Sequence, residues 1–282
     1  MQIFYGKVAL MDYLTSKKAA NPSIGFVPTM GALHKGHQSL MRQSVKENDL
    51  TVVSIFVNPT QFNNPEDLEK YPRNLEEDVL KISEINPDII VFAPTVDDMY
   101  EGKTISQTFD FDGLENKMEG KFRPGHFDGV GTIVKRLFEI VTPTKAYFGE
   151  KDFQQVQIVK KMVAKNHLPV IIVVCPILRE TNNLAMSSRN ERLTLQQKKE
   201  AGIIYKTLKE AKNKFATNSA KKTTQWVQNE FNKNQEFTLE YFEIADEDTL
   251  STCIRKNKNK KYRAFIAVFI NNVRLIDTIS LN

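Results

Sequence analysis

Short apolar segments that alternate with longer amphipathic segments constrain the fold of this chain most strongly. Five segments that are rich in β-branched or aromatic residues and poor in charge are predicted strands: 24–27, 51–57, 89–93, 146–148 and 170–174. Runs of this kind are typical of parallel strands that are buried on both faces. The amphipathic segments between them are predicted helices: 36–48, 74–85, 129–141 and 153–166. Their alternation predicts an α/β fold, with a parallel sheet and helices on both of its faces.

The pattern changes after Cys175 and Pro176. Two helical patterns follow, a long Lys/Glu-rich one at 192–216 and another at 221–234, and then strands over 237–246 and 262–281. The charged stretch 255–263 before the last hairpin is interpreted as a solvated turn rather than a nucleic-acid site. We therefore predict two domains, an α/β domain at 1–175 and a smaller α+β domain at 176–282.

Composition and charge limit the class of protein. The 282 residues carry 39 Lys and Arg against 34 Asp and Glu, a net charge of +5. A mildly basic chain suits an enzyme that handles phosphates, and it also suits nucleic-acid binding. We expect no nucleic-acid partner, because many of the charges lie in helical stretches of mixed sign.

The compartment is predicted from cysteine content and from the lack of targeting signals. Cys175 and Cys253 are the only cysteines, and so few in a long chain favour a reducing compartment. The N-terminal apolar stretch contains Lys7 and Asp12 and has no cleavage site, so it is not interpreted as a signal peptide. No apolar run reaches about 18 residues, so no membrane span is expected. A cytoplasmic protein is the prediction.

The first loop to inspect follows the strand predicted at 24–27, because ligands of parallel sheets bind beyond the carboxyl ends of the strands. It reads PTMGALHKGH, with small residues at Gly31 and Ala32 and two histidines, His34 and His37. Glycine lets backbone N–H groups approach an anion closely, and a helix N-terminus adds a positive dipole. At this spacing both imidazoles share one face of a helix, where they could donate to phosphate. A metal site and a pair of helix-capping histidines are the alternatives.

The second and third loops also carry polar side chains at strand or helix ends. Gln61 follows the predicted strand 51–57, and its amide suits a substrate with hydroxyl and carboxylate groups, although a surface turn is the alternative. Arg123 and His126 precede a predicted helix. They suit an anionic ligand, but the neighbouring glycines could equally serve packing.

The fourth and fifth loops combine cations with hydroxyl or carboxylate groups. After the strand 146–148, Lys151 could reach phosphate. Asp152 could cap a helix or bind ribose, an amine or hydrated magnesium. The fifth loop, LAMSSRNERL, places two serines before Arg189, which gives convergent donors for phosphate. Such runs also cap helices, here through Ser188 or Asn190.

Together these loops predict a nucleotide site at one edge of the sheet. Neither the phosphate-binding pattern G-x-x-x-x-G-K-[ST] nor the dinucleotide pattern G-x-G-x-x-G is present. The site is therefore expected to be of the HxGH kind.

Five motifs, in their order and spacing, resemble those of the pantoate–β-alanine ligase family. They are PTMGALHKGH, FVNPTQF, RPGHFDGV, GEKDFQQ and MSSRN. The HxGH element alone is less specific, because the wider nucleotidyltransferase superfamily shares it. The resemblance covers essentially the whole chain. It implies a Rossmann-like N-terminal domain, a C-terminal domain that acts as a lid, and a homodimer. The activity it implies is ATP-dependent ligation of pantoate to β-alanine through pantoyl adenylate, with release of AMP and pyrophosphate.

The resemblance also implies roles for individual residues. ATP contacts are expected at Met30, Gly31, Ala32, Leu33, His34, Lys35, Gly36, His37, Gly149, Glu150, Lys151, Asp152, Leu178, Met186, Ser187, Ser188 and Arg189. Catalytic roles fall on His34, His37, Lys151 and Arg189, with His37 at the position usually assigned as proton donor. Leu178 stands where the family often has valine and contacts adenine through its backbone.

The substrates and the metal follow from the same resemblance. Gln61 is expected to hold pantoate and help with β-alanine, and Gln155 is expected to bind pantoate. Magnesium is expected to bind mainly through the ATP phosphates, so no metal site made by the protein alone is predicted. Two alternatives stay open: another HxGH nucleotidyltransferase that joins a different acid to AMP, and a basic RNA-binding protein whose fold no longer catalyses.

Overall fold

The chain forms two compact units in a computed structural model that describes residues 1–17 and 20–282. The first unit comprises Met1–Gly149 and Gln155–Pro176, and the second comprises Glu150–Gln154 and Ile177–Asn282. The chain therefore enters the second unit for one short segment, returns to the first, and enters the second again after Pro176.

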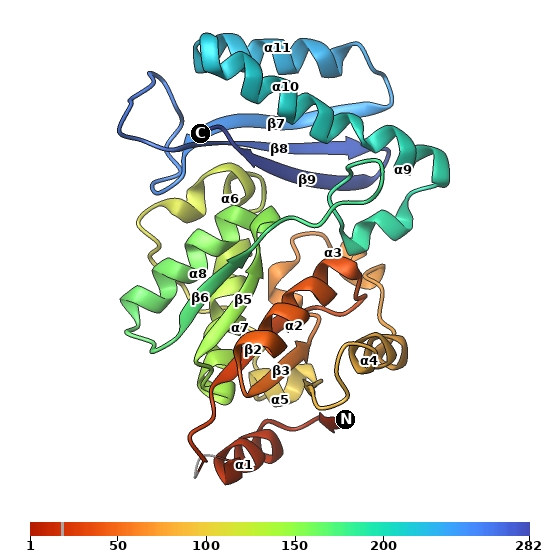
Figure 1. Ribbon diagram of the computed structural model, residues 1–282, viewed down its shortest axis with the longest axis vertical. Helices are drawn as coiled ribbons and strands as arrows, with labels where there is room; N and C mark the ends of the chain where they lie inside the picture. The colour runs from red at the N-terminus through yellow and green to blue at the C-terminus, as the bar shows by residue number, and fades with distance from the viewer. Residues whose placement is uncertain (18–19) are drawn as a thin grey trace. The chain divides into compact units, whose positions relative to one another are not determined.

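A six-stranded sheet forms the centre of the first unit (Figure 1), and every pair of neighbouring strands in it is parallel. The strand order is β1-β4-β3-β2-β5-β6. The strands are β1 (Gln2–Phe4), β2 (Ile24–Thr29), β3 (Leu50–Ile55), β4 (Ile90–Phe92), β5 (Lys145–Gly149) and β6 (Ile171–Cys175). The parallel sheet predicted from the apolar runs is confirmed.

Helices connect the strands of the first unit. They are α1 (Lys7–Lys17), α2 (Lys35–Glu47), η2 (Pro59–Gln61), α3 (Pro65–Glu69), α4 (Leu75–Ser83), α5 (Val96–Tyr100), η3 (Leu114–Asn116), α6 (Met118–Phe122), α7 (His126–Val141) and α8 (Phe153–Lys165). The sequence analysis did not predict β1, α1 or the short helices α3, α5 and α6.

Both faces of this sheet are covered by apolar side chains from helices. On one face, Met41 of α2 and Ile82 of α4 share a core with Val53 of β3. On the other, Phe138 of α7 packs edge-on against Phe26 and Phe148, with ring centroids 6.1 and 6.5 Å apart. Burial on both faces explains why these strands read as apolar runs without alternation.

The strand order places a topological switch point between β2 and β5. From β2 the chain runs outward through β3 and β4, and it then returns to form β5 on the other side of β2. Ligands of open α/β sheets bind in the crevice outside the carboxyl ends of the strands at such a point. The two segments at these ends are 30–37, after β2, and Gly149, the last residue of β5.

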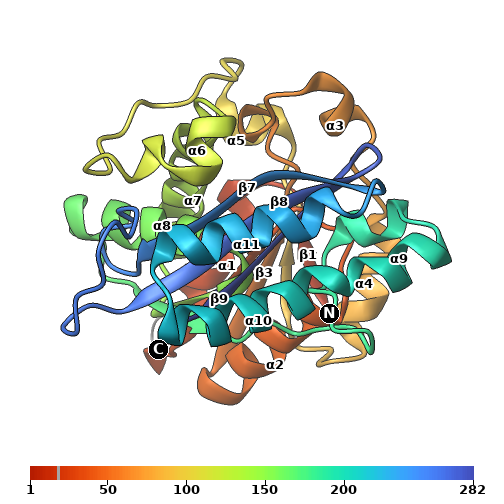
Figure 2. The ribbon, with the colours of Figure 1, turned by 90° about the horizontal axis from the view of Figure 1, so that it is seen from above.

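The second unit is a three-stranded antiparallel sheet covered by helices α10 and α11, which lie across it in Figure 2. Its strands are β7 (Phe237–Asp246), β8 (Tyr262–Ile270) and β9 (Val273–Ser280). Its helices are η5 (Ser188–Arg192), α9 (Leu195–Ala201), α10 (Ile203–Thr217) and α11 (Ala220–Asn232), and it also includes η4 (Glu150–Asp152). Leu208, Phe231, Ile266 and Leu275 lie in its core.

The long helical pattern predicted at 192–216 is helical from Leu195 onward, but it is divided into two helices, α9 and α10. η5 ends at Arg192, and Thr194 then caps α9. Gly202 separates α9 from α10. A Cβ at Gly202 would lie 2.6 Å from the carbonyl oxygen of Asn182, so this close approach of two backbones requires glycine.

Candidate active site

The loop after β2 turns sharply before α2 begins. Gly31 and Ala32 both have positive φ, +79° and +49°. The loop is held by Asp78 of α4, whose carboxylate accepts the N–H of Ala32 at 2.8 Å and that of Leu33 at 2.7 Å. A Cβ at Gly31 would lie 2.9 Å from a carboxylate oxygen of Asp78. The position of this carboxylate therefore leaves no room for a side chain at residue 31.

Asp78 is a residue that sequence analysis missed. Its side chain is 2% exposed, and burial raises the pKa of its carboxyl group while the two N–H donors oppose that shift. In the sequence it stands in the first turn of a helix beside two glutamates, where acidic residues are common for other reasons. No pattern in the sequence around Asp78 indicates that its side chain bonds a loop 46 positions away.

His34 and His37 lie together at the start of α2, as their spacing predicted. Their ring centroids are 4.0 Å apart, with 31° between the ring planes. His34 is the N-cap: its Nδ1 accepts the N–H of Gly36 at 3.1 Å, and Nδ1 of His37 accepts the N–H of His34 at 3.4 Å. An Nδ1 that accepts leaves the proton of a neutral imidazole on Nε2, so each ring presents an Nε2–H donor. Capping therefore fixes two donors rather than competing with a phosphate-binding role.

Gln61 ends η2, and its position is fixed by the loop predicted around Arg123 and His126. The Gln61 carbonyl accepts His126 Nδ1–H at 2.9 Å and an Arg123 N–H at 3.1 Å. His126 Nε2 in turn accepts from Arg123 at 3.2 Å. Asn58 donates to the Gln61 side-chain oxygen at 3.0 Å. Within the first unit, Arg123 and His126 therefore support Gln61.

Asn58 is a second residue whose role sequence analysis missed. It is 0% exposed, accepts the hydroxyl of Tyr100 at 2.5 Å, and donates to the carbonyl of Gly129 at 3.1 Å. Burial raises the pKa of Tyr100, which keeps its hydroxyl a donor. A Cβ at Gly129 would lie 2.4 Å from the carbonyl oxygen of Thr60. Helix α7 and η2 are thus in close backbone contact.

The predicted phosphate-binding cations lie in the second unit. Lys151 pairs with Asp152 at 3.2 Å in η4. In the MSSRN segment, Ser187 caps η5, and its hydroxyl accepts the N–H of Arg189 at 3.3 Å. The alternative in which Ser188 or Asn190 is the cap does not hold, because the N-caps of η5 and α9 are Ser187 and Thr194. Asn190 instead donates to the Ala185 carbonyl at 3.1 Å.

The predicted site residues thus form two groups, each within its own unit. The first unit holds residues 30–37, Gln61, Gly149 and Gln155, and the second holds residues 150–152, Leu178 and 186–189. In the second group, the carbonyl of Leu178 accepts the N–H of Met186 at 3.1 Å, which joins two predicted ATP contacts directly.

Among residues 1–17 and 20–282, no group of three or more His, Cys, Asp and Glu side chains is placed to hold a metal ion. Within the same residues, no helix is both long and apolar enough to cross a membrane.

Comparison with known proteins assigns the chain to a family. The pantoate-beta-alanine ligase profile matches residues 2–280. The chain is 65% identical to the pantothenate synthetase of Flavobacterium psychrophilum and 57% identical to that of Christiangramia forsetii, in both cases over 100% of each chain.

Solved structures agree. A pantothenate synthetase structure from Thermus thermophilus matches with a TM-score of 0.89 and 36% identity, covering 100% of this chain and 99% of that one. A pantoate-beta-alanine ligase structure from Francisella tularensis, described as complexed with beta-gamma ATP and beta-alanine, matches with a TM-score of 0.81 and 36% identity, covering 100% and 98%. The chain is therefore a ligase and belongs to the pantoate–β-alanine ligase family.

Proposed function

We propose that the two groups of residues described above carry out the ATP-dependent ligation of pantoate to β-alanine, with ATP bound by residues 30–37, 149–152, 178 and 186–189. One observation carries the assignment. The HxGH helix start lies at the switch point of the sheet, with both Nδ1 atoms used in capping and both Nε2–H groups set as donors. The Francisella tularensis ligase, described as complexed with beta-gamma ATP and beta-alanine, supports the same substrates here.

The first step joins pantoate to AMP. A carboxylate oxygen of pantoate attacks the α-phosphorus of ATP, a new P–O bond forms, and the bond to the β-phosphate oxygen breaks to release pyrophosphate. The substrate itself is the nucleophile, so the protein has to position the reactants and stabilise negative charge. Imidazole N–H groups of His34 and His37, the ammonium of Lys151 and the guanidinium of Arg189 supply that stabilisation.

The second step forms the amide. The β-alanine amine attacks the carbonyl carbon of pantoyl adenylate, AMP leaves with the bonding electrons, and the amine nitrogen loses a proton. Gln61 and Gln155 hold the pantoate portion through amide hydrogen bonds. The carbonyl of Gln61 accepts hydrogen bonds from Arg123 and His126, which restrain its backbone position.

Magnesium fits this donor set as an ion held mainly by ATP. It prefers oxygen ligands and keeps much of its water when substrate phosphates bind it. Asp152 supplies one carboxylate beside Lys151 and is the residue that would contact the hydrated ion. When bound, the ion neutralises charge on the phosphates.

The C-terminal unit acts as a lid in this proposal, because an acyl adenylate is hydrolysed if water reaches it. A homodimer and a cytoplasmic location complete the proposal. The cytoplasmic assignment is supported by two buried cysteines, Cys175 and Cys253, that are not joined in a disulfide.

Pyrophosphate exchange into ATP tests the two-step reaction. Exchange should require pantoate and proceed without β-alanine, because the first step is complete before the amine enters. Exchange supported only by other acids would indicate a different HxGH nucleotidyltransferase. No exchange with any acid would refute the catalytic assignment and favour an RNA-binding protein instead.

A further inference from the structure

Lys151 belongs to the second unit, although its place in the sequence is between two elements of the first. The segment Glu150–Gln154 follows β5 and leads into α8, yet its contacts are with the unit that contains the C-terminal sheet. Strand β9 contacts η4, which carries Lys151. We therefore expect a side chain of the C-terminal sheet to hold Glu150–Gln154 in the second unit.

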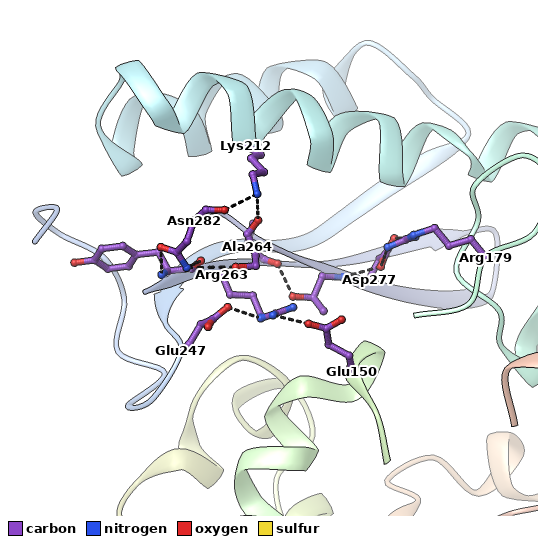
Figure 3. A network of polar contacts seen from close by, with 11 residues as sticks. Glu150, Arg179, Lys212, Glu247, Arg263, Ala264, Asp277 and Asn282 are labelled. Carbon is purple, nitrogen blue, oxygen red and sulfur yellow. Dashed lines mark hydrogen bonds and ion pairs between the residues drawn. The ribbon is translucent and has the colours of Figure 1, made fainter. Parts of the chain in front are cut away.

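Arg263 of β8 is the residue that does so, as Figure 3 shows. Its guanidinium donates to Glu150 at 2.7 Å and to Glu247 at 3.1 Å, and it lies 4.1 Å from the centroid of the Phe153 ring. Phe153 also contacts Phe265 of β8, with ring centroids 6.0 Å apart. Residues on both sides of Lys151 are thus fixed to one strand.

The environment of Arg263 makes this attachment specific. The residue is 4% exposed, and a buried cation is tolerated when it is paired and hydrogen-bonded. The planar guanidinium reaches two carboxylates and stacks on a ring at the same time, which a lysine ammonium cannot do. Removing the guanidinium would release Glu150 and leave Glu247 without this donor.

The same sheet holds the other phosphate-binding segment. Strand β9 contacts η5, which begins at Ser188, as well as η4. Asp277 of β9 is bonded to Arg179 at 2.6 and 3.0 Å (Figure 3), and Arg179 lies 3.5 Å from the ring centroid of Tyr205. Burial raises the pKa of Asp277, while Arg179 and, to a smaller extent, Lys151 lower it, which agrees with Lys151 lying near this strand.

We propose that Arg263 is a positioning residue of the ligase: by holding Glu150 and Phe153 it keeps Lys151 on the C-terminal sheet, so that Lys151 and residues 187–189 act on the ATP phosphates as one rigid group. The inference rests on the proposed function of Lys151 as a phosphate-binding residue. Arg263 touches no reacting atom in this account and acts only through Lys151.

A double-mutant cycle tests the proposal in the full chain, with pyrophosphate exchange in the presence of pantoate as the readout. Lys151→Ala should slow exchange by about 10²- to 10³-fold, as loss of one stabilising donor typically does. Arg263→Met should slow it by about 10- to 100-fold through kcat, with KM for pantoate little changed. In the double variant, exchange should be no slower than in Lys151→Ala alone, because a misplaced lysine and an absent lysine are then equivalent.

Two further variants control for folding. Arg274 forms a similar pair with Glu240 in the same sheet, with an N–O distance of 2.9 Å, and Arg274→Met should leave exchange unchanged. Glu150→Ala removes the acceptor of Arg263 from the side of η4 and should slow exchange in the wild-type background but not in the Lys151→Ala background. This variant keeps the pair of Arg263 with Glu247, so it tests the proposal even if Arg263→Met does not fold.

The outcomes separate the two claims. If Lys151→Ala exchanges at the wild-type rate, the phosphate-binding role of Lys151 is wrong and the positioning role of Arg263 falls with it. If Lys151→Ala is slow, but Glu150→Ala or Arg263→Met is as fast as wild type, only the positioning role is wrong. The positioning role is also wrong if the fold-reductions in exchange rate of the two single variants multiply in the double variant. In that case Arg263→Met would slow exchange independently of Lys151, as general destabilisation does.

Discussion

Replacing His34 by asparagine separates the two roles that the structure gives this residue. His34 caps α2 through Nδ1, and it presents Nε2–H as a donor. Alanine removes both functions. Asparagine is among the best N-cap residues, so it restores the cap but supplies no imidazole.

The expected sizes of the two effects differ enough to be told apart. Loss of an N-cap costs about 1 kcal/mol of stability, which for a chain of this size corresponds to a fall of about 2–4 °C in Tm. Loss of a donor that stabilises transition-state charge costs about 10²–10³ in rate, or about 2.7–4 kcal/mol. We therefore expect His34→Ala to lose both Tm and exchange activity, and His34→Asn to keep Tm and lose exchange activity.

Thermal unfolding and initial rates of pyrophosphate exchange at saturating pantoate measure these effects. His37→Gln is the matched variant for the second ring, because glutamine at this position of a helix can also bond back to the N-cap N–H. Wild-type exchange in His34→Asn would refute the reasoning, since capping would then be the whole role of His34.

Asp78→Ala should lower the free energy of unfolding by about 3 kcal/mol, because two hydrogen bonds to a buried carboxylate are lost; chemical denaturation measures this, and an unchanged value would contradict it. Burial raises the pKa of Asp78, so the stability linked to its protonation is complete below its unfolded pKa near 3.8 and is lost as pH rises through the higher folded pKa. Wild-type stability relative to Asp78→Asn should thus fall over that range in urea titrations from pH 4 to 7, and a flat or rising difference would refute the sign. Gly129→Ala should raise KM for pantoate several-fold, because its Cβ would meet the Thr60 carbonyl oxygen at 2.4 Å, whereas Gly6→Ala, with no atom within 4 Å, should not. A chelator should abolish exchange without shifting the Tm of the ligand-free protein, since among residues 1–17 and 20–282 no side-chain cluster is placed to hold a metal; a lowered Tm would reveal a structural ion.

Much of the fold was predictable because its elements have local signatures. Strands buried on both faces carry few charges, and amphipathic helices show their period directly. The strand predicted at 237–246 has the same bounds as β7. The rule that ligands bind at strand ends selected the loop after β2, and the switch point indeed lies beside it.

The supporting residues were not predictable, because their partners are distant in the sequence. Asp78 bonds a loop 46 positions away, and Arg263 bonds Glu150 at a separation of 113. The sequence near these residues contains no pattern that would predict either contact. The interruption at Gly202 was missed for the same reason, since it depends on the close approach of Asn182 rather than on the helical sequence around it.

Because the segment Glu150–Gln154 belongs to the second unit, a single cut in the chain cannot separate the two units. Cutting after Pro176 would not yield two autonomous pieces. The N-terminal fragment would keep Phe153 without the aromatic partner that it has on β8, and the C-terminal fragment would keep Arg263 without Glu150. We expect the N-terminal fragment to aggregate more readily than the whole chain, and the C-terminal fragment to be less stable than the same residues are in the intact protein. The two pieces should complement each other when mixed, so that split-protein reconstitution is a natural assay for how the segment is held.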